Sequence, residues 1–246
     1  MKKTLITATA VLAFTAGSAL AAEHPHWGYS GEEGPDHWGE LDPAYEICAK
    51  GLNQSPINLT GFIEAELEPI TFEYSGLVTE VVNNGHSIQA NYAAGSTIKA
   101  AGRTFELKQF HFHSPSENHI DGKEFPLEAH FVHVDTEGHI AVIGVMFEIG
   151  EENPGLRKLW KQMPEEEGTR AAMATQVRAD ELLPADRDYY RFNGSLTTPP
   201  CTEGVYWFMM KNYLTASREQ VEQFTRVMGH PDNRPIQPTD ARPVLK

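Results

Sequence analysis

The sequence predicts one mainly β domain with a large sheet. Between about residues 70 and 148 the chain is a succession of short apolar runs with period-two alternation, separated by turn-forming residues. Only two segments, 155–163 and 216–228, have helical spacing. The chain contains no repeat, low-complexity tract or linker. The strands and helices are therefore expected to share one core.

The expected strands are separated by short turns. Asn84-Gly85 is a dipeptide typical of hairpin turns, and Gly102 interrupts a second alternating run. Thr136-Glu137-Gly138 separates two further runs, and a last apolar run has the composition of a buried strand. The regions expected to form strands are 77–92, 96–113, 127–135, 139–150 and 204–214.

The second helix has a clear start signal. Ser217 can cap its first turn, and Gln220 follows three residues later, which is the spacing of a capping box. By contrast, residues 23–58 are rich in Gly, Pro, Trp and Asn and have little periodicity. We expect them to form an extended, loop-rich segment.

Residues 1–21 are predicted to be a secretory signal peptide. Lys2 and Lys3 precede an apolar run of small residues, and Ala19-Leu20-Ala21 matches an A-x-A cleavage site. The alternative is an uncleaved membrane anchor. Cleavage between residues 21 and 22 leaves a single domain, 22–246. No later stretch is apolar enough to span a bilayer, so we expect a periplasmic or secreted protein without membrane contact after cleavage.

Charge and cysteine content narrow the choice of partners and compartment. The formal net charge is −14, which disfavours nucleic acid and anionic membranes as partners. The charge is dispersed along the chain, so solubility explains it most simply. Cys48 and Cys201 are the two cysteines, and neither lies in a C-x-x-C motif. After export we expect them to form a disulfide, the alternative being two buried thiols.

Five of the eleven histidines lie between residues 108 and 133. On a strand, residues i and i+2 share a face, so His111 and His113 lie together, and His130 lies opposite His133. If the two strands are neighbours, His111, His113 and His130 converge. Three neutral imidazoles that leave one coordination position open are typical of catalytic zinc sites.

Two polar residues lie on the same strand face as these histidines. Gln109 and Glu128 lie two positions from His111 and His130 and can accept their second N–H groups, as the ligands of a metal usually require. Spacing alone leaves open a pair of partly exposed histidines without metal. His119 is expected to face solvent from a polar loop, and His133 is expected to be structural.

Eight short segments follow one another along the chain in a recognisable order. They are HWGY (26–29), QSPIN (54–58), NNGH (83–86), QFHFH (109–113), SEN (116–118), EAHFVH (128–133), GSLTTPPC (194–201) and NRPIQP (233–238). Taken together they resemble the α-class carbonic anhydrases in their bacterial exported form, and the resemblance covers nearly the whole mature chain. It implies a large, twisted, mostly antiparallel β-sheet with a few surface helices. The implied reaction is the reversible hydration of CO₂ to bicarbonate and a proton, through attack by a zinc-bound hydroxide.

The resemblance also implies roles for individual residues. It makes His111, His113 and His130 the ligands of Zn²⁺, with Gln109 and Glu128 as their hydrogen-bond partners. Thr197 would accept a hydrogen bond from the hydroxide and donate its own to Glu117, and His86 would relay the proton to solvent. The other implied residues are Val132, Val142, Leu196 and Trp207 as an apolar wall for CO₂, Thr198 as a contact for bicarbonate, and Tyr29, Asn84 and Gln89 as the lining of the proton path.

Cys48 and Cys201 match the disulfide of the exported members. Bacterial members are often dimers, so the resemblance admits a homodimer, but nothing in the sequence decides the oligomeric state. At two positions the chain departs from the family pattern. Asn118 and Phe192 stand where many members have a histidine and a tyrosine, whose side chains can meet behind the zinc site. We hypothesise a paired substitution, because replacing both partners of a buried contact can be nearly neutral.

Two other functions are compatible with such a chain. A non-catalytic binding module on the same fold would usually lack a zinc histidine, whereas all three are present together with His86, Glu117 and Thr197. An exported zinc esterase would be indicated by an added base such as the Glu of H-E-x-x-H, a motif that the sequence does not contain.

Overall fold

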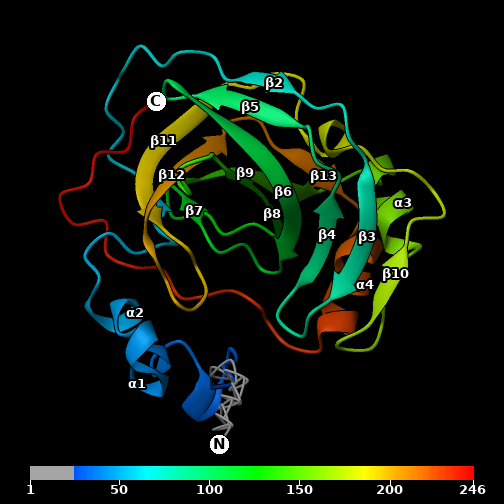
Figure 1. The fold of residues 1–246 in the computed structure, drawn as a ribbon, viewed down its shortest axis with the longest axis horizontal. Helices are drawn as coiled ribbons and strands as arrows, with labels where there is room; N and C mark the ends of the chain where they lie inside the picture. Colours follow the sequence, from blue (N-terminus) through cyan, green and yellow to red (C-terminus); the bar gives the residue numbers. More distant parts are fainter. Residues whose placement is uncertain (1–24) are drawn as a thin grey trace, which may run out of the picture.

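The computed structural model describes residues 25–246, so the predicted signal peptide and its cleavage position lie outside the described residues. A strongly twisted sheet of eleven strands forms the centre of the molecule (Figure 1), in the order β10-β3-β4-β6-β8-β9-β12-β11, with β2, β5 and β13 paired alongside. The strands are β2 (Thr71–Glu73), β3 (Val78–Asn83), β4 (Ile88–Tyr92), β5 (Thr97–Ala100), β6 (Arg103–His113), β8 (Leu127–Val134), β9 (Ile140–Ile149), β10 (Arg170–Ala172), β11 (Tyr189–Ser195), β12 (Glu203–Met210) and β13 (Leu214–Ala216).

Most strand pairs are antiparallel, which confirms the predicted fold class. The exceptions within the sheet are β12 and β13, which both run parallel to β9. A separate parallel pair joins β1 (Asn58–Leu59) to β7 (His119–Ile120). The helical elements are η1 (Gly31–Glu33), α1 (Trp38–Leu41), η2 (Pro43–Tyr45), α2 (Ile47–Lys50), α3 (Pro154–Trp160), η3 (Ala179–Leu182) and α4 (Arg218–Met228).

The predicted turns lie where the sequence places them. Gly85 has φ +81° between β3 and β4, a backbone conformation that favours glycine. Ala101 and Gly102, with φ of 50° and 72°, connect β5 to β6. Helix α4 starts with the expected capping box of Ser217 and Gln220. The sequence patterns did not indicate β2, β10 or β11.

One predicted helix is shorter than expected, and the expectation for the N-terminal segment was wrong. The helix predicted over 155–163 is present as α3, which ends at Trp160. The segment expected to be extended contains α1, α2 and two 3₁₀ turns. Their packing centres on the buried Trp38, whose indole N–H donates to the carbonyls of Gly28 and Glu33.

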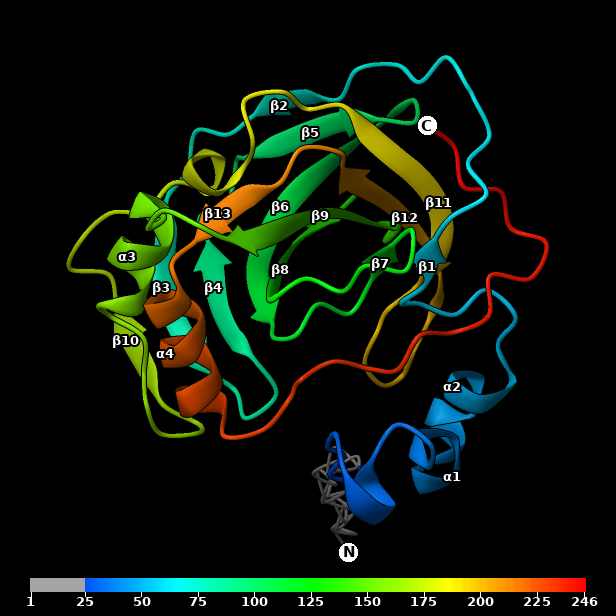
Figure 2. The same cartoon turned by 180° about the vertical axis from the view of Figure 1, so that it is seen from behind.

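The two faces of the sheet differ in chemistry. Phe110, Phe112 and Phe131 point to the side that α3 and α4 cover, where Phe112 packs on Trp160 with ring centroids 4.8 Å apart. Figure 2 shows these two helices side by side against β3, β4 and β10. The same strands turn His111, His113 and His130 to the other face. One hydrophobic core therefore holds β6 and β8 rigidly beneath the candidate site.

The two remaining histidines of the cluster have different surroundings. His133 lies on the core face, fully buried, with Nε2 2.6 Å from the hydroxyl of Tyr74. For His119 the expectation of an exposed loop was wrong. It lies in β7, where its N–H donates to the carbonyl of Ile57, and its side chain is only 24% exposed beside Glu124.

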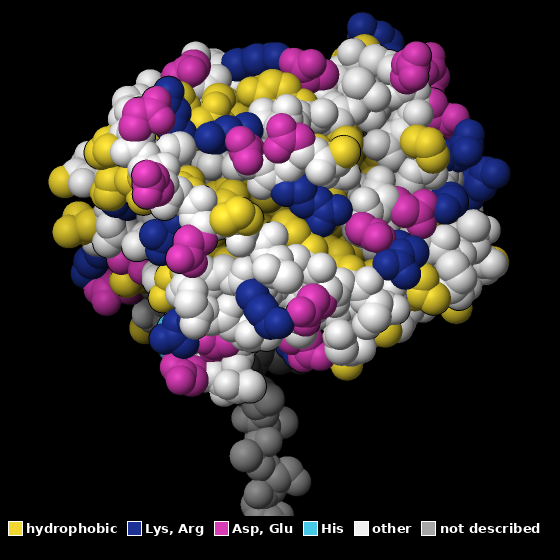
Figure 3. All heavy atoms as spheres, turned by 90° about the horizontal axis from the view of Figure 1, so that it is seen from above, with side chains coloured by type: hydrophobic (Ala, Val, Ile, Leu, Met, Phe, Trp, Pro, Cys, Tyr) yellow, Lys and Arg dark blue, Asp and Glu magenta, His cyan; other side chains and the backbone are white. Residues whose placement is uncertain are grey.

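The molecular surface agrees with dispersed charge. On the face shown in Figure 3, basic and acidic side chains are interspersed. Among residues 25–246, no helix has the length and apolar character that crossing a membrane requires.

The buried His133 makes stability depend on pH. Burial lowers the pKa of His133 to about 3, from about 6.5 in an unfolded chain. The unfolded state therefore binds more protons between these values, and stability is complete above pH 6.5 and falls as pH drops toward 3. From pH 7 to 5 this group alone removes about 2 kcal/mol of unfolding free energy.

We predict that His133→Gln makes the loss of stability between pH 7 and pH 5 smaller by about 2 kcal/mol, measured by denaturant unfolding at both values. Histidine 119 provides the control, because His119→Gln removes an imidazole outside the core. Equal losses in His133→Gln and the unsubstituted protein would show that His133 does not carry this dependence.

Candidate metal centre and active site

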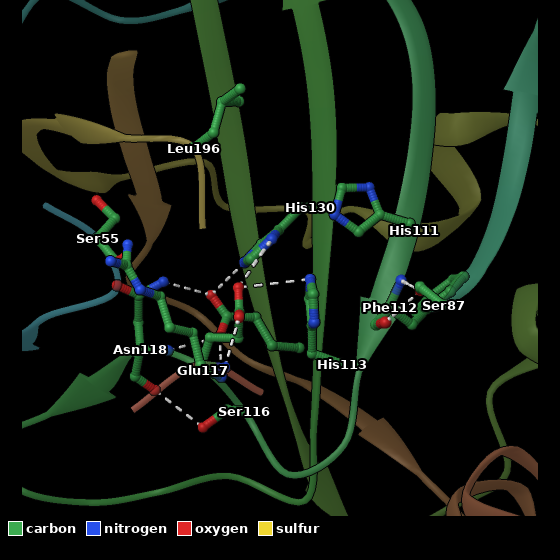
Figure 4. Close-up of polar contacts among 12 residues, drawn as sticks. Ser55, Ser87, His111, Phe112, His113, Ser116, Glu117, Asn118, His130 and Leu196 are labelled. Atoms are coloured by element: carbon green, nitrogen blue, oxygen red, sulfur yellow. Dashed lines mark hydrogen bonds and ion pairs between the residues drawn. The ribbon is translucent and has the colours of Figure 1, made fainter. Parts of the chain in front are cut away.

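Three histidines converge on the open face of the sheet. His111 and His130 are directly opposite each other in the pairing of β6 with β8, and His113 lies opposite Glu128. In Figure 4 the rings of His111, His113 and His130 point toward one another. One ligand nitrogen from each lies within 4.8 Å of the other two. The neighbouring strands that the sequence argument required are therefore present.

The outer nitrogen of each ring is already bonded. His111 Nδ1 lies 2.8 Å from Gln109 Oε1, His113 Nδ1 lies 2.6 Å from the carbonyl of Asp232, and His130 Nε2 lies 2.7 Å from Glu128 Oε1. Amide, carbonyl and carboxylate oxygens accept hydrogen bonds, so each of these nitrogens carries the proton. The lone pairs are then on Nε2 of His111, Nε2 of His113 and Nδ1 of His130, which face the centre.

These residues fit a zinc ion. His113 Nε2 is buried and has no hydrogen-bond partner among the described residues, which a ligand atom for a metal explains. Burial, together with the neighbouring imidazoles, holds the pKa of His111 and of His130 well below the ordinary value. Both rings are therefore neutral, as metal ligands must be.

A second group of metal-binding residue types fails the same test. Asp135, Glu137 and His139 lie close together at the turn between β8 and β9. Their ligand atoms are bonded to Arg103 Nη1, at 2.8 Å from Asp135, 3.1 Å from Glu137 and 3.1 Å from His139. The guanidinium already supplies the positive charge in this group.

The Glu128 carboxylate holds several parts of the site at once. Besides His130, it accepts hydrogen bonds from the main-chain N–H groups of Glu117 and Asn118, each 2.8 Å long. The Asn118 amide adds a third donor at 2.8 Å. The fully buried Glu128 therefore positions both a zinc ligand and the backbone of Glu117.

The departures from the family pattern also have defined surroundings. The Asn118 side chain uses its oxygen as well, which accepts from the N–H of Ile57 at 3.1 Å. Phe192 stacks on Trp207, with ring centroids 5.7 Å apart and planes 5° apart. Paired substitution at positions 118 and 192 stays a hypothesis, which a double-mutant cycle on the two positions tests.

Glu117 lies beneath the three histidines. Its Oε2 is 3.5 Å from His113 Nε2 and 3.8 Å from His130 Nδ1 (Figure 4). Burial raises the pKa of Glu117 to about 8, while interactions with the N–H of Arg234 and the side chain of Thr197 lower it. A cation held by the histidines would favour the ionised carboxylate further. Thr197 is itself buried and next to this carboxylate.

Arg234 ties Glu117 to the N-terminal segment. Its main-chain N–H donates to Glu117 Oε1 at 2.9 Å. Its buried guanidinium donates to the carbonyls of Ser55, at 2.7 Å, and Cys48, at 2.8 Å. The predicted disulfide of Cys48 and Cys201 is present, with Cα atoms 5.0 Å apart and a sequence separation of 153. Arg234 therefore connects Cys48, one half of the disulfide, to Glu117 through two hydrogen bonds.

An apolar wall adjoins the metal centre. Val132, Val142 and Trp207 are register partners on β8, β9 and β12. They pack in one cluster that Leu196 also contacts. The edge of Trp207 meets His130 with centroids 4.9 Å apart. Thr198 is half-buried in the loop that follows Leu196. The structure thus brings the expected pocket residues together.

His86 lies half-buried on the β3–β4 turn. Its ring stacks on Trp27 with centroids 3.7 Å apart, and Asn84 Oδ1 accepts its main-chain N–H at 2.9 Å. Burial and the nearby His26 lower the pKa of His86. Between this turn and the metal centre, Gln89 is the register partner of His111. Tyr29 is half-buried, and its pKa is raised first by desolvation and then by the nearby carboxylates of Glu117 and Asp232.

Sequence reasoning missed Arg234, Asp232 and Gln54. Gln54 Nε2 donates to the carbonyl of Cys201 at 3.1 Å, and Arg234 Nη1 donates to Gln54 Oε1 at 2.9 Å. Both residues belong to segments that the resemblance included, QSPIN and NRPIQP, so their presence there was the available signal. Asp232 accepts the hydrogen bond of His113 through its main-chain carbonyl, an interaction that leaves no signature in the sequence, and its carboxylate accepts from the main-chain N–H of Ser114.

The fold and the site define a β-sheet protein with a three-histidine zinc centre. The sequence matches the eukaryotic-type carbonic anhydrase family over residues 33–246, and the chain belongs to this family. It is 46% identical to a carbonic anhydrase of Pectobacterium carotovorum over 228 residues, covering 93% of each chain. It is also 46% identical to a carbonic anhydrase of Neisseria gonorrhoeae over 243 residues, covering 98% of this chain and 96% of the relative.

Solved structures agree with this assignment. The α-carbonic anhydrase of Thermovibrio ammonificans in complex with sulfanilamide is 50% identical and superposes with a TM-score of 0.89, covering 90% of this chain and 99% of that chain. The chain is thus an α-carbonic anhydrase whose zinc site is formed by His111, His113 and His130.

The partner of His111 provides a test of the centre that does not depend on activity. We predict that Gln109→Ala weakens zinc binding about 10- to 100-fold, because His111 loses the acceptor that orients its ring. Competition with a fluorescent zinc chelator measures the affinity. Gln89→Ala is the control, since Gln89 neighbours His111 but hydrogen-bonds to Asn91. Equal zinc affinities for the two variants would contradict the prediction.

Proposed function

We propose that the protein catalyses the reversible hydration of CO₂ to bicarbonate and a proton. One observation carries the proposal: one ring nitrogen from each of three imidazoles faces a single point beside an apolar wall. Zinc held there acts as a Lewis acid that allows water to ionise near neutral pH. The chain's own residues orient the attacking oxygen, bind CO₂ and remove the proton around that point.

The hydroxyl of Thr197 orients the attacking oxygen. A carboxylate has no proton to donate, so Thr197 donates its proton toward Glu117, and its lone pairs remain free to accept from the attacking oxygen. Glu117 stays in place because Arg234 donates to its Oε1, while Glu128 holds its backbone. The oxygen's remaining lone pair then faces the substrate, which lowers the entropic part of the barrier.

The apolar wall binds CO₂ without a charged group. CO₂ has no net dipole, so contacts with Val132, Val142, Leu196 and Trp207 suit it better than a cationic clamp would. Bicarbonate carries a charge and fits this wall poorly, which favours product release. Thr198 offers the polar contact at the edge of the pocket.

His86 removes the proton. Tyr29, Asn84 and Gln89 line the proposed proton path and supply polar groups for connecting waters. An imidazole that titrates near neutrality can accept the proton and release it to solvent.

The decisive measurement is CO₂ hydration by the purified protein before and after removal of zinc with a chelator. We expect activity to disappear on chelation and to return when zinc is added. A rate that does not depend on zinc, or no rate with zinc bound, would overturn the proposed function.

His86→Ala is expected to lower the turnover number on the order of 10²-fold in weakly buffering solution, because proton release then depends on water. The value of kcat/KM for CO₂ should not change, and added imidazole should restore most of the turnover. His119→Ala, remote from the site, is the control. An unchanged turnover number in His86→Ala that is insensitive to imidazole would exclude this histidine as the proton carrier.

The disulfide is expected to support both stability and activity. Replacing Cys48 and Cys201 by Ala should lower the unfolding free energy by about 5 kcal/mol, because the bridge closes a very long loop. It should also lower CO₂ hydration at temperatures where the variant stays folded, since the guanidinium of Arg234 bonds to Cys48. Melting temperature and turnover measure the two effects, and no change in either would refute the proposal.

The location follows from the same bridge. A disulfide persists in oxidising compartments, which supports a place outside the cytoplasm, and we propose the periplasm or the extracellular medium. N-terminal sequencing of the mature protein tests cleavage between residues 21 and 22. Light scattering tests whether the protein forms a homodimer in solution.

A further inference from the structure

A carboxylate from a distant loop lies against the turn that carries His86. The loop of residues 164–169 follows α3, and Glu167 lies exposed within it. A Cβ atom added to Gly85 would lie 2.5 Å from Glu167 Oε1. The carboxylate therefore packs directly on the backbone of the residue before His86.

Asn83 fixes this arrangement. Its N–H donates to the carbonyl of Thr169 at 3.1 Å, and its carbonyl accepts from the N–H of Gly168 at 2.8 Å. Its buried side chain donates to the carbonyl of Pro164 at 3.3 Å and accepts from the N–H of Gly85 at 3.1 Å. The loop and the turn are thus joined on both sides of Glu167, so the backbone of this residue is fixed beside the His86 turn.

Burial and two neighbouring histidines oppose a positive charge on the His86 ring. The indole of Trp27 stacks on one face of this ring, with centroids 3.7 Å apart. His26, with its ring centroid 5.9 Å away, comes from the N-terminal segment, and His230 comes from the segment after α4. Among the described residues, Glu167 is the charged group that favours the protonated ring.

We propose that Glu167 is a positioning residue for proton release, which stabilises the protonated imidazole of His86 in its half-buried position. This inference rests on the proposed role of His86. A proton carrier works best when its pKa is close to that of its donor and to the ambient pH. Glu167 opposes the effect of burial on the His86 ring and so keeps it an effective acceptor.

The test compares Glu167→Gln with Glu166→Gln in the zinc-loaded protein. Glu166→Gln removes the same charge one residue away. NMR titration of the His86 imidazole measures its pKa in each protein. In Glu167→Gln we expect this pKa to fall by about half a pH unit at low salt, and by much less in 0.5 M NaCl, where screening shortens the range of the interaction. Glu166→Gln should give the value of the unsubstituted protein.

Kinetics then connect the titration to proton release. The pH profile of the turnover number should move to lower pH in Glu167→Gln by the same amount as the titration, while kcat/KM for CO₂ stays unchanged. An unchanged pKa of His86 in Glu167→Gln overturns the inference. So does a shifted pKa with an unchanged turnover profile. If His86→Ala also leaves turnover unchanged, the failure lies in the proposed proton carrier rather than in the contact with Glu167.

Discussion

The direct pairing of His111 with His130 across β6 and β8 is the constraint on which the rest of the site depends. It places two zinc ligands face to face and the third, His113, one pleat further along the same strand. A shift of one residue in this register would put His130 on the opposite face of the sheet from His111 and His113, and the three imidazoles would no longer converge. The phenylalanines on the opposite face, packed beneath α3 and α4, oppose any such shift because they would then be exposed.

Two buried carboxylates, Glu128 and Glu117, link the zinc ligands to the threonine that orients the attacking oxygen. Glu128 bonds to His130 and to the backbone of Glu117 and Asn118, and Glu117 then lies within reach of both His113 and Thr197. Burying carboxylates is costly unless their oxygens are hydrogen-bonded, and here the partners come from several segments. The disulfide and Arg234 complete the network from the N-terminal side. Ligand orientation, the threonine loop and the N-terminal segment thus form one structural unit.

Local patterns predicted much of the fold. Period-two alternation revealed β3 to β6, β8, β9 and β12, and a capping box marked the start of α4. Short or irregular elements were missed, because β2 and β10 are only three residues long and take their conformation from the neighbouring strand. The same reason explains His119, whose strand β7 exists only through its pairing with β1.

For the site, the sequence by itself determined which side chains share a face. Alternation separated His130 from His133 and put Gln109 and Glu128 in step with the zinc ligands. Tertiary structure alone decided the contacts between distant segments: the carbonyl of Asp232 on His113, the guanidinium of Arg234 on Cys48, and Glu167 beside the turn of His86. Such contacts depend on loop paths and main-chain atoms, and neither leaves a periodic signal in a single sequence.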